Sequence, residues 1–350
     1  MMRTAFDEGL CAIVTRLTQR PHAEAAFAEL LDLTAPLDLA RLPDWEARFR
    51  HAHWFAQYQR EQAVRPTWRD RWLAGLPFLT SRRLEAPVAL PPWIDLASGD
   101  GYARERALRA LRGPAPNRFF FALALRRLND WVPQVRAAAR EVLLPLARAS
   151  DPQYVVDVLS AILPVWTTWG RMQAPERTIV ASLTEIDAVS AALVNRLLAA
   201  RHGPAATVLS QCLRSPGLDL HLPRLAAHAV QPAVRSVACR SLLAGRARWL
   251  EGRAREWKDL RYVVARVVPV VGERPLTQTP AFLASFEAAV ADRSFHVRRV
   301  AAQALVVEME TLDPATLRDF AQRLTRDPSR CVAERGEFIL KHAKTLAAPA

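Results

Sequence analysis

The sequence predicts an all-α protein in which pairs of helices repeat and stack into an α-solenoid. A short pattern that returns three times after residue 129 carries most of this prediction. Apolar residues recur at helical spacing around each copy, and 51% of the 350 residues are hydrophobic. Repetition of one supersecondary unit is typical of a superhelix in which each unit covers the apolar flank of its neighbour.

The repeated pattern is a polar turn, then Val-Arg at the start of an apolar helix, then Ala three residues after the Arg. The turn proline of the first copy, Pro133, is tolerated because its missing N–H costs little at a helix start. Clear copies lie at 130–139, 231–238 and 292–301, and a weaker copy lies at 98–111.

Each copy joins two segments of helical periodicity. Around the first copy these segments are Phe119–Leu128 and Val135–Arg148. The same organisation predicts helix pairs over 220–244, 280–310 and 313–346. Helices without the pattern are expected at Val155–Val165, Thr178–Ala200 and Ala205–Leu213.

The first 97 residues differ from the repeats. Ala23–Leu33 and Pro43–Arg60 have the apolar spacing of helices. A stretch rich in tryptophan and proline follows, and its last part, Arg82–Ile94, is predicted to be extended or irregular. We therefore expect a helical capping region over 1–97 and a repeat array over 98–350.

The turn aspartate, the proline and the Val-Arg pair resemble the HEAT repeat, including its shorter form in phycobilisome-lyase-like proteins. That resemblance implies a right-handed α-solenoid. It also implies a ladder of hydrogen bonds between neighbouring repeats, made by the turn aspartate and the helix arginine. Asp130 with Arg136, and Asp292 with Arg298, match these two positions at the same spacing.

Two copies depart from the HEAT pattern. The copy that contains Arg235 has Ala229 where the aspartate belongs. The last copy begins at Asp327 and has Ala333 where the arginine belongs, which is typical of a terminal repeat.

The positive charge is concentrated in two blocks. The formal net charge is +13, and residues 101–150 carry 10 basic against 3 acidic side chains, while residues 201–250 carry 7 against 1. Such clustering favours a localised basic face. In the first block, Arg109 and Arg112 follow the pattern at helical spacing and are candidates for a binding stripe, although a structural role is the commoner one.

The segment Gly245–Arg261 has the strongest functional signal. Its basic side chains can neutralise phosphates and its tryptophans can stack on bases, which suits a nucleic-acid strand. The alternative is a solvated helix between repeats, with its tryptophans over the core and its arginines paired to nearby carboxylates. The candidate binding residues are Arg246, Arg248, Trp249, Arg253, Arg255, Trp257, Lys258 and Arg261.

Motifs for metal, cofactor or nucleophilic chemistry are missing from the sequence. His51 and His53 are two residues apart, so on a helix they diverge by about 200° and form no common ligand pair. The chain has no HExxH, GxGxxG, GxxxxGK[ST] or GxSxG motif. We therefore expect no metal, no cofactor and no catalytic residue.

The compartment is expected to be the cytoplasm. Cys11, Cys212, Cys239 and Cys331 lie far apart without a CxxC pair, which favours reduced thiols, most of them in the core. The start of the chain has acidic residues where a signal peptide needs a basic run, and no apolar run of about 18 residues suggests a membrane span.

These observations predict a non-enzymatic scaffold that binds a macromolecule along its concave surface, with an acidic protein as the first choice of partner. Nucleic acid is the second choice. A third is an enzyme similar to the alkylated-base DNA glycosylases, which are built from HEAT-like helices and use tryptophans and one aspartate. Trp166 and Trp169 raise that alternative, but no continuous match to the glycosylase catalytic segment exists.

Overall fold

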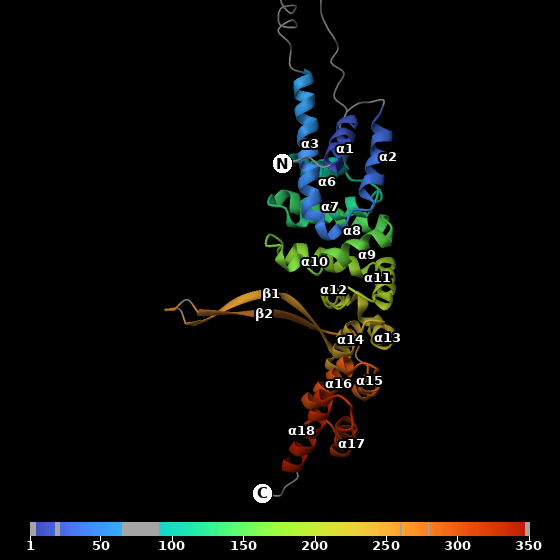
Figure 1. Cartoon of the computed structure of the whole chain (residues 1–350), viewed down its shortest axis with the longest axis vertical. Helices are drawn as coiled ribbons and strands as arrows, with labels where there is room; N and C mark the ends of the chain where they lie inside the picture. The colour runs from blue at the N-terminus through green and yellow to red at the C-terminus, as the bar shows by residue number, and fades with distance from the viewer. Residues whose placement is uncertain are drawn as a thin grey trace, which may run out of the picture. The chain divides into compact units, whose positions relative to one another are not determined.

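The computed structural model describes residues 5–17, 22–64, 91–259, 261–262, 264–278 and 280–346. Within these ranges the chain is largely helical, with many paired helices and one β-hairpin (Figure 1). Contacts divide it into two compact units, Met1–Ile162 with Gly170–Ile179, and Leu163–Trp169 with Val180–Ala350. The division at residue 97 that the sequence suggests stays a prediction.

The first unit consists of helices that pack around a core of phenylalanines. Phe119 and Phe120 of α7 are fully buried and contact Phe49 of α3. Asn117 caps α7, because its side chain accepts from the backbone amides of Phe119 and Phe120. The helices are α1 (Ala5–Arg16), α2 (Ala23–Thr34), α3 (Leu42–Val64), α5 (Pro92–Asp95), α6 (Gly101–Ala110), α7 (Arg118–Arg126), α8 (Pro133–Ala149) and α9 (Pro152–Ile162), with 3-10 turns η2 (Leu39–Arg41) and η3 (Arg127–Asn129).

The expectation of an extended or irregular linker over 82–94 is wrong at its end. Residues 82–90 lie outside the described part of the chain. Residues Pro92–Asp95 form the short helix α5, in which Trp93 and Ile94 are buried. The burial of these two apolar side chains, one of them beside Phe120, favours a compact turn over an extended chain.

The second unit continues with helix pairs and carries the hairpin. α10 (Ala174–Ser182) runs from the first unit into this one. The predicted helix over 178–200 is interrupted by the 3-10 turn η5, so it forms two elements. The elements are η4 (Trp166–Thr168), η5 (Leu183–Glu185), α11 (Asp187–Ala199), α12 (Ala205–Cys212), η6 (Pro216–His221), α13 (Leu222–His228), α14 (Pro232–Ala244), β1 (Arg246–Asp259), β2 (Val264–Pro275), α15 (Phe282–Val290), α16 (Phe295–Val307), α17 (Pro314–Thr325) and α18 (Arg330–Leu346).

The all-α prediction is wrong at one place, where residues 246–275 form a β-hairpin. The alternative of a helix over 245–261 is wrong for the same reason. β1 pairs antiparallel with β2, and the two strands form a ribbon that leaves the helices of the second unit (Figure 1). Gly245 ends α14 with φ +64°, a left-handed conformation that glycine adopts without strain. The chain returns at Leu276, whose amide donates to the carbonyl of Gly245 at 3.0 Å and closes the base of the ribbon.

The pattern arginines join successive helix pairs. Arg235 donates from Nε and NH2 to both carboxylate oxygens of Asp292, at 2.7 and 2.9 Å, and from NH1 to the carbonyls of Ala229 and Val230 in its own turn. Ala229 in place of the aspartate does not affect this contact, because the arginine binds the backbone carbonyl of that position, as Arg298 binds the carbonyl of Asp292. Arg235 is almost fully buried.

The same arrangement is found at other copies within each unit. Arg104 binds Asp130 at 2.8 Å through both Nε and NH2, and Arg298 binds Asp327 at 2.6 and 3.0 Å. Arg136 donates to the carbonyl of Asp130 at 2.9 Å and lies 3.9 Å from Glu176. Arg136, Arg235 and Arg298 thus bind the turn before their own helix. Arg104, Arg235 and Arg298 also form a bidentate pair with the aspartate of the next helix pair, whereas Arg136 only approaches Glu176.

The hairpin is an insertion into this ladder. Arg235 and Asp292 are 57 residues apart, whereas Arg298 and Asp327 are 29 apart. The two spacings differ by 28 residues, close to the 30 residues from Arg246 through Pro275. Without the hairpin, α14 and α15 would follow one another at the ordinary spacing of the pattern.

Membrane crossing by a single helix is not supported within the described residues. The one combination that passes by length and composition is Ala174–Glu185 with Asp187–Ala199, which is bent by 80°.

Replacing Arg235 by Ala should lower the free energy of unfolding by about 1–3 kcal/mol, because it leaves the partly buried Asp292 carboxylate without its partner. Arg330→Ala is the control: Arg330 is 91% exposed and its change should stay below about 0.5 kcal/mol. Urea denaturation of the two variants measures the difference. A loss at position 235 no larger than that at position 330 would show that the ladder does not stabilise the fold.

The ladder aspartates should make the fold sensitive to acid. Burial opposes ionisation of Asp292, but hydrogen bonds from Arg235 and the Ser294 amide outweigh it and hold its pKa below the usual value. The hydrogen bond from Arg298 lowers the pKa of Asp327 in the same way. A carboxyl whose folded pKa is depressed stabilises the fold above its unfolded pKa of about 4, and this stability is lost as the pH falls through the folded value. The melting temperature should therefore stay level from about pH 7 to pH 5 and fall below about pH 4, with a shallower fall in Asp327→Asn.

Candidate functional site

The root of the hairpin is fixed to the helices by a buried carboxylate. Asp219 of η6 accepts from Arg274 of β2 at 2.6 and 2.8 Å and from the backbone and side chain of Thr277 at 2.9 and 3.1 Å. Arg274 also donates to the carbonyls of Leu213 and Ser215. Burial opposes the charge on Asp219, but the bonds from Arg274 and Thr277 keep its pKa below the usual value, so the carboxylate is ionised at neutral pH.

Trp249 fixes one face of the root. The guanidinium of Arg214 lies 5.4 Å from the Trp249 ring and 4.8 Å from the ring of Trp166, so it sits against both indoles. Arg214 also binds Glu251 at 2.9 Å, and the indole N–H of Trp249 donates to the same carboxylate at 2.5 Å. Trp249 is therefore a structural residue of the root, as the alternative interpretation of this tryptophan expected.

A β-bulge decides which side chains share a face. Leu250 is paired with Val271 and Gly252 with Val270, so Glu251 is one extra residue in β1. Residues opposite one another point to the same face, and faces alternate along each strand. Arg246 and Arg248 before the bulge therefore lie on the same face as Arg253 and Arg255 beyond it; without the extra residue the two pairs would lie on opposite faces.

We call this set the arginine face: Arg246, Arg248, Arg253, Arg255 and Trp257 of β1. Ala247 and Trp249 point to the opposite face, against the helices, where Ala247 is fully buried. At about 3.3 Å per residue, the row from Arg246 to Trp257 is roughly 36 Å long. The opposing residues of β2 on this face include Val271, Pro269 and Val267, which add an apolar row beside the basic one.

The charges at the root and at the outer end differ in their partners. Arg248 binds Glu273 directly across the ribbon at 2.8 Å, and Arg246, which is opposite Pro275, reaches the same carboxylate diagonally at 2.9 Å. The side chains of Arg253 and Arg255 are exposed and form no hydrogen bond or ion pair with any residue that the structure describes. Lys258, the extra residue of a second irregularity between Trp257 and Asp259, is exposed in the same way. The backbone amide of Arg261 donates to Asp259 at 2.8 Å near the tip.

A groove adjoins the root on the side of the arginine face. Its volume is about 710 Å³, and α14, α16, α18 and the start of β1 line it. Arg240 and Arg299, both exposed, have no ion-pair partner among the described residues, and Arg335 donates to Gln303 at 3.0 Å. We call it the root groove; it is lined by Arg240, Leu243, Ala244, Arg246, Arg248, Arg299, Val300, Gln303, Ala304, Val307, Glu308 and Arg335.

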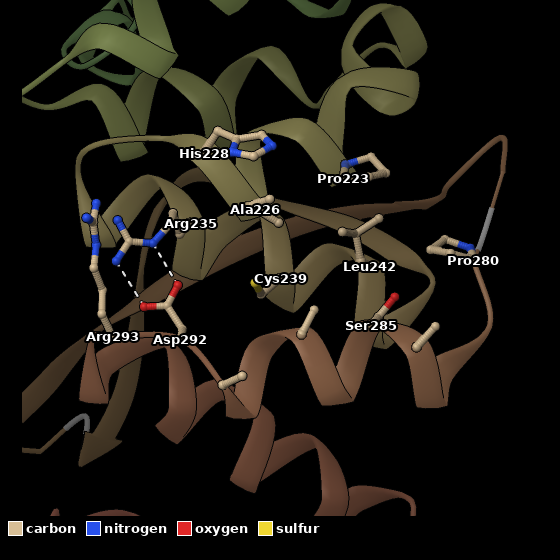
Figure 2. A pocket seen from close by; sticks show the side chains of 14 residues that line it. Pro223, Ala226, His228, Arg235, Cys239, Leu242, Pro280, Ser285, Asp292 and Arg293 are labelled. Carbon is tan, nitrogen blue, oxygen red and sulfur yellow. Dashed lines mark hydrogen bonds and ion pairs between the residues drawn. The ribbon is translucent and has the colours of Figure 1, made fainter.

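A second cavity lies between α13, α14 and α15, and its volume is about 690 Å³ (Figure 2). Arg235, Asp292, Arg293 and His228 gather at one end, and Leu242, Pro223 and Pro280 lie at the other. The Arg235–Asp292 pair in it is already part of the ladder. Burial, aided by the Asp292 carboxylate, raises the pKa of Cys239 to about 11, so the thiol stays protonated near neutral pH and is not a nucleophile.

Most arginines of the first basic block bind carboxylates or carbonyls of the fold. Arg109 binds Glu105 at 3.2 Å and Glu141 at 2.5 Å, and Arg112 donates to the carbonyls of Arg109 and Leu111 at 2.7 Å. The remaining arginines with internal partners are Arg104, Arg118, Arg126, Arg127, Arg136 and Arg140. Arg106 and Arg148 of the same block are exposed without a partner among the described residues, so eight of its ten arginines, including both candidates, bind groups of the fold.

The other sequence candidates are also engaged within the fold. His53 is buried and its Nε2 lies 2.9 Å from Asp95, and in the described ranges no three metal-binding side chains come together. Trp166 and Trp169 are buried, and the Trp166 indole donates to Gln211 at 2.9 Å. Cys11, Cys212 and Cys239 are buried free thiols, as expected, and Cys331 is exposed.

The chain matches no protein-family model, and no curated protein matches its sequence. The candidate site therefore stands on geometry alone.

Sequence reasoning found the arginines of β1 but missed the groove beside them. Arg240, Arg299 and Arg335 come from three helices and have no shared sequence signal. Strand β2, in contrast, had a sequence signal: the run from Val264 to Val271 is rich in β-branched residues, which is typical of strands. A hairpin partner for 246–259 was therefore visible in the sequence.

The packing at the root predicts different effects for two glycines of the same ribbon. A Cβ at Gly272 would lie 2.5 Å from Trp249 Nε1, whereas a Cβ at Gly252 meets nothing within 4 Å. Gly272→Ala should displace the indole, cost about 1–3 kcal/mol and reduce hydrogen-exchange protection in residues 246–251. Gly252→Ala should change both by little. Equal protection in the two variants would show that Trp249 does not hold the root.

Proposed function

We propose that this protein is a non-enzymatic, HEAT-like right-handed α-solenoid of the cytoplasm that binds nucleic acid through the arginine face of its hairpin. One observation carries the proposal: the bulge at Glu251 aligns four arginines and Trp257 on one face, and the outer two arginines have no partner among the described residues. Guanidinium groups bind phosphate oxygens, and exposed aromatic rings stack on bases.

The geometry moves the preferred partner from an acidic protein to nucleic acid. Side chains on one face of a strand repeat about every 6.6 Å, so a row of arginines presents charge at a regular step. A polymer with one phosphate per residue carries charge in the same regular way. An acidic protein surface has no such period, although the valines and proline beside the arginines give it some support as a second candidate.

Two features support a role without catalysis. The residues that first suggested a glycosylase, Trp166 and Trp169, are buried in packing contacts. The thiol in the cavity between α13 and α15 is held in its protonated form. Release of free methylated base from alkylated DNA above background would contradict the non-enzymatic part of the proposal.

Binding should weaken steeply with salt, and removal of outer arginines should reduce that slope. If Arg253 and Arg255 each neutralise one phosphate, the double variant R253A/R255A should lower the slope of log K against log salt by about 1.8 on duplex DNA or about 1.4 on a single strand. Fluorescence anisotropy with labelled oligonucleotides from 50 to 200 mM salt measures both slopes.

The control is the double variant R318A/R326A, which removes two exposed arginines of α17 and its C-terminal end, outside the lining of the root groove. It should leave the slope unchanged. Failure of the native protein to bind any DNA or RNA at 50 mM salt would contradict the proposal, as would equal effects of the two double variants.

A further inference from the structure

We infer that the ligand is double-helical, with the outer part of the hairpin lying in one groove of the duplex and the root groove holding the adjoining backbone. This inference rests on the proposed function and specifies its ligand. It depends on three features of the second unit: an outer ribbon whose described side chains are exposed on both faces, an apolar row beside the arginines, and a basic groove at the root.

Within the part of the chain that the structure describes, the outer part of the ribbon is exposed on both of its faces. We call residues 252–259 and 264–270 the arm. Its side chains at 253–258, 265–267, 269 and 270 are exposed, and they lie on both faces. An isolated two-stranded ribbon is only marginally stable in water, so such an arm gains from a partner that surrounds it. A single strand covers one face of a ribbon, whereas a groove contacts one face at its floor and both edges at its walls.

The dimensions of the arm fit a duplex groove. Paired strands lie about 4.8 Å apart, and the major groove of B-form DNA, about 12 Å wide and 8.5 Å deep, admits a two-stranded ribbon. From Gly252 to Asp259 the arm extends for about 23 Å, which exceeds the depth of the groove. Its root is held by Asp219 and Trp249, so the arm is presented to the duplex in a fixed direction.

The chemistry of the arginine face also favours a duplex. Arg253 and Arg255 lie on β1, and directly opposite them on the same face lie Pro269 and Val267, the latter 56% exposed. In a groove, one row can reach a phosphodiester backbone while the other contacts sugars and base edges, a combination that groove-binding proteins use. Single-strand binding depends on successive aromatic platforms, and Trp257 is the one aromatic side chain on this face among the described residues.

The root groove supplies contacts to the backbone beyond the arm. Arg240 of α14 and Arg299 of α16 line it together with Arg246 and Arg248, and Glu308 is the acidic residue in the lining. Because Arg246 and Arg248 are paired with Glu273, the unpaired positive charge of the groove comes from Arg240 and Arg299, and the groove adjoins the arginine face through Arg246 and Arg248. A backbone that leaves the arm would meet these guanidinium groups next, and contacts of this kind fix the register of a protein on a duplex.

The arm itself is tested by shortening it. Replacing residues 253–269 with Asn-Gly joins Gly252 to Val270 through a two-residue turn and keeps the anchors at Asp219 and Trp249. Anisotropy is measured with a mixed 20-base-pair DNA duplex, with one of its strands alone, and with polyglutamate as competitor. The native protein should bind the duplex at least tenfold more tightly than the strand, and the shortened protein should lose at least tenfold of its duplex affinity.

A point variant guards against misfolding of the shortened protein. Val267→Glu places a carboxylate on the arginine face at an exposed site and should weaken duplex binding at least fivefold. Leu283→Glu is its control, because Leu283 is a similarly exposed apolar residue on α15 that lines neither cavity. R240A/R299A should weaken duplex binding as well, compared with R318A/R326A.

The outcomes separate the two proposals. Equal or tighter binding to the single strand would overturn the duplex inference, while the proposed nucleic-acid binding by the arginine face stands. Unchanged duplex affinity after Val267→Glu and after removal of the arm would overturn both. Displacement of the duplex by polyglutamate at equal charge concentration would point to an acidic protein and overturn both. Absence of binding to either nucleic acid would also overturn both.

Discussion

The bidentate pairing of a buried arginine with the aspartate of the next helix pair is the interaction on which the second unit depends. Arg235 gives two donors to Asp292 and a third to the turn before its own helix, so one side chain fixes three pieces of backbone. Arg235 is buried and Asp292 is partly buried, so the loss of either partner leaves a charge that water compensates poorly. The pairing made across the hairpin is the same as the one between Arg298 and Asp327, although thirty residues are inserted after α14.

The two ends of the hairpin lie close together, and this explains how the helices accommodate a long ribbon. Gly245 and Leu276 are joined by a backbone hydrogen bond, so the hairpin leaves and re-enters the chain at nearly one point. The ladder closes across this point from Arg235 to Asp292, with the same bidentate geometry as between Arg298 and Asp327. The insertion therefore adds a surface to the protein without changing the repeat that carries it.

The arginines of this chain fall into two classes that composition does not distinguish. In the first basic block they bind carboxylates or carbonyls of the fold, as Arg104, Arg109 and Arg127 do. On the arm and at the root groove, Arg253, Arg255, Arg240 and Arg299 have no such partner among the described residues. Other exposed arginines, such as Arg318 and Arg326, also lack a partner, and what distinguishes these four is that they are grouped on one ribbon face and in one groove.

The sequence by itself determined the helix pairs and the residues that link them, because Val-Arg after a polar turn is a local pattern that reports its own structure. The strand over 246–259 was not predicted, because alternating arginine and small residues fit a solvated helix as well as a strand until the β-branched partner at 264–275 is considered. Only the tertiary structure decided the face of the arginines, because one bulge residue, Glu251, inverts the alternation beyond it. It also decided which cations are free, since pairing depends on carboxylates that are distant in the chain and close in space.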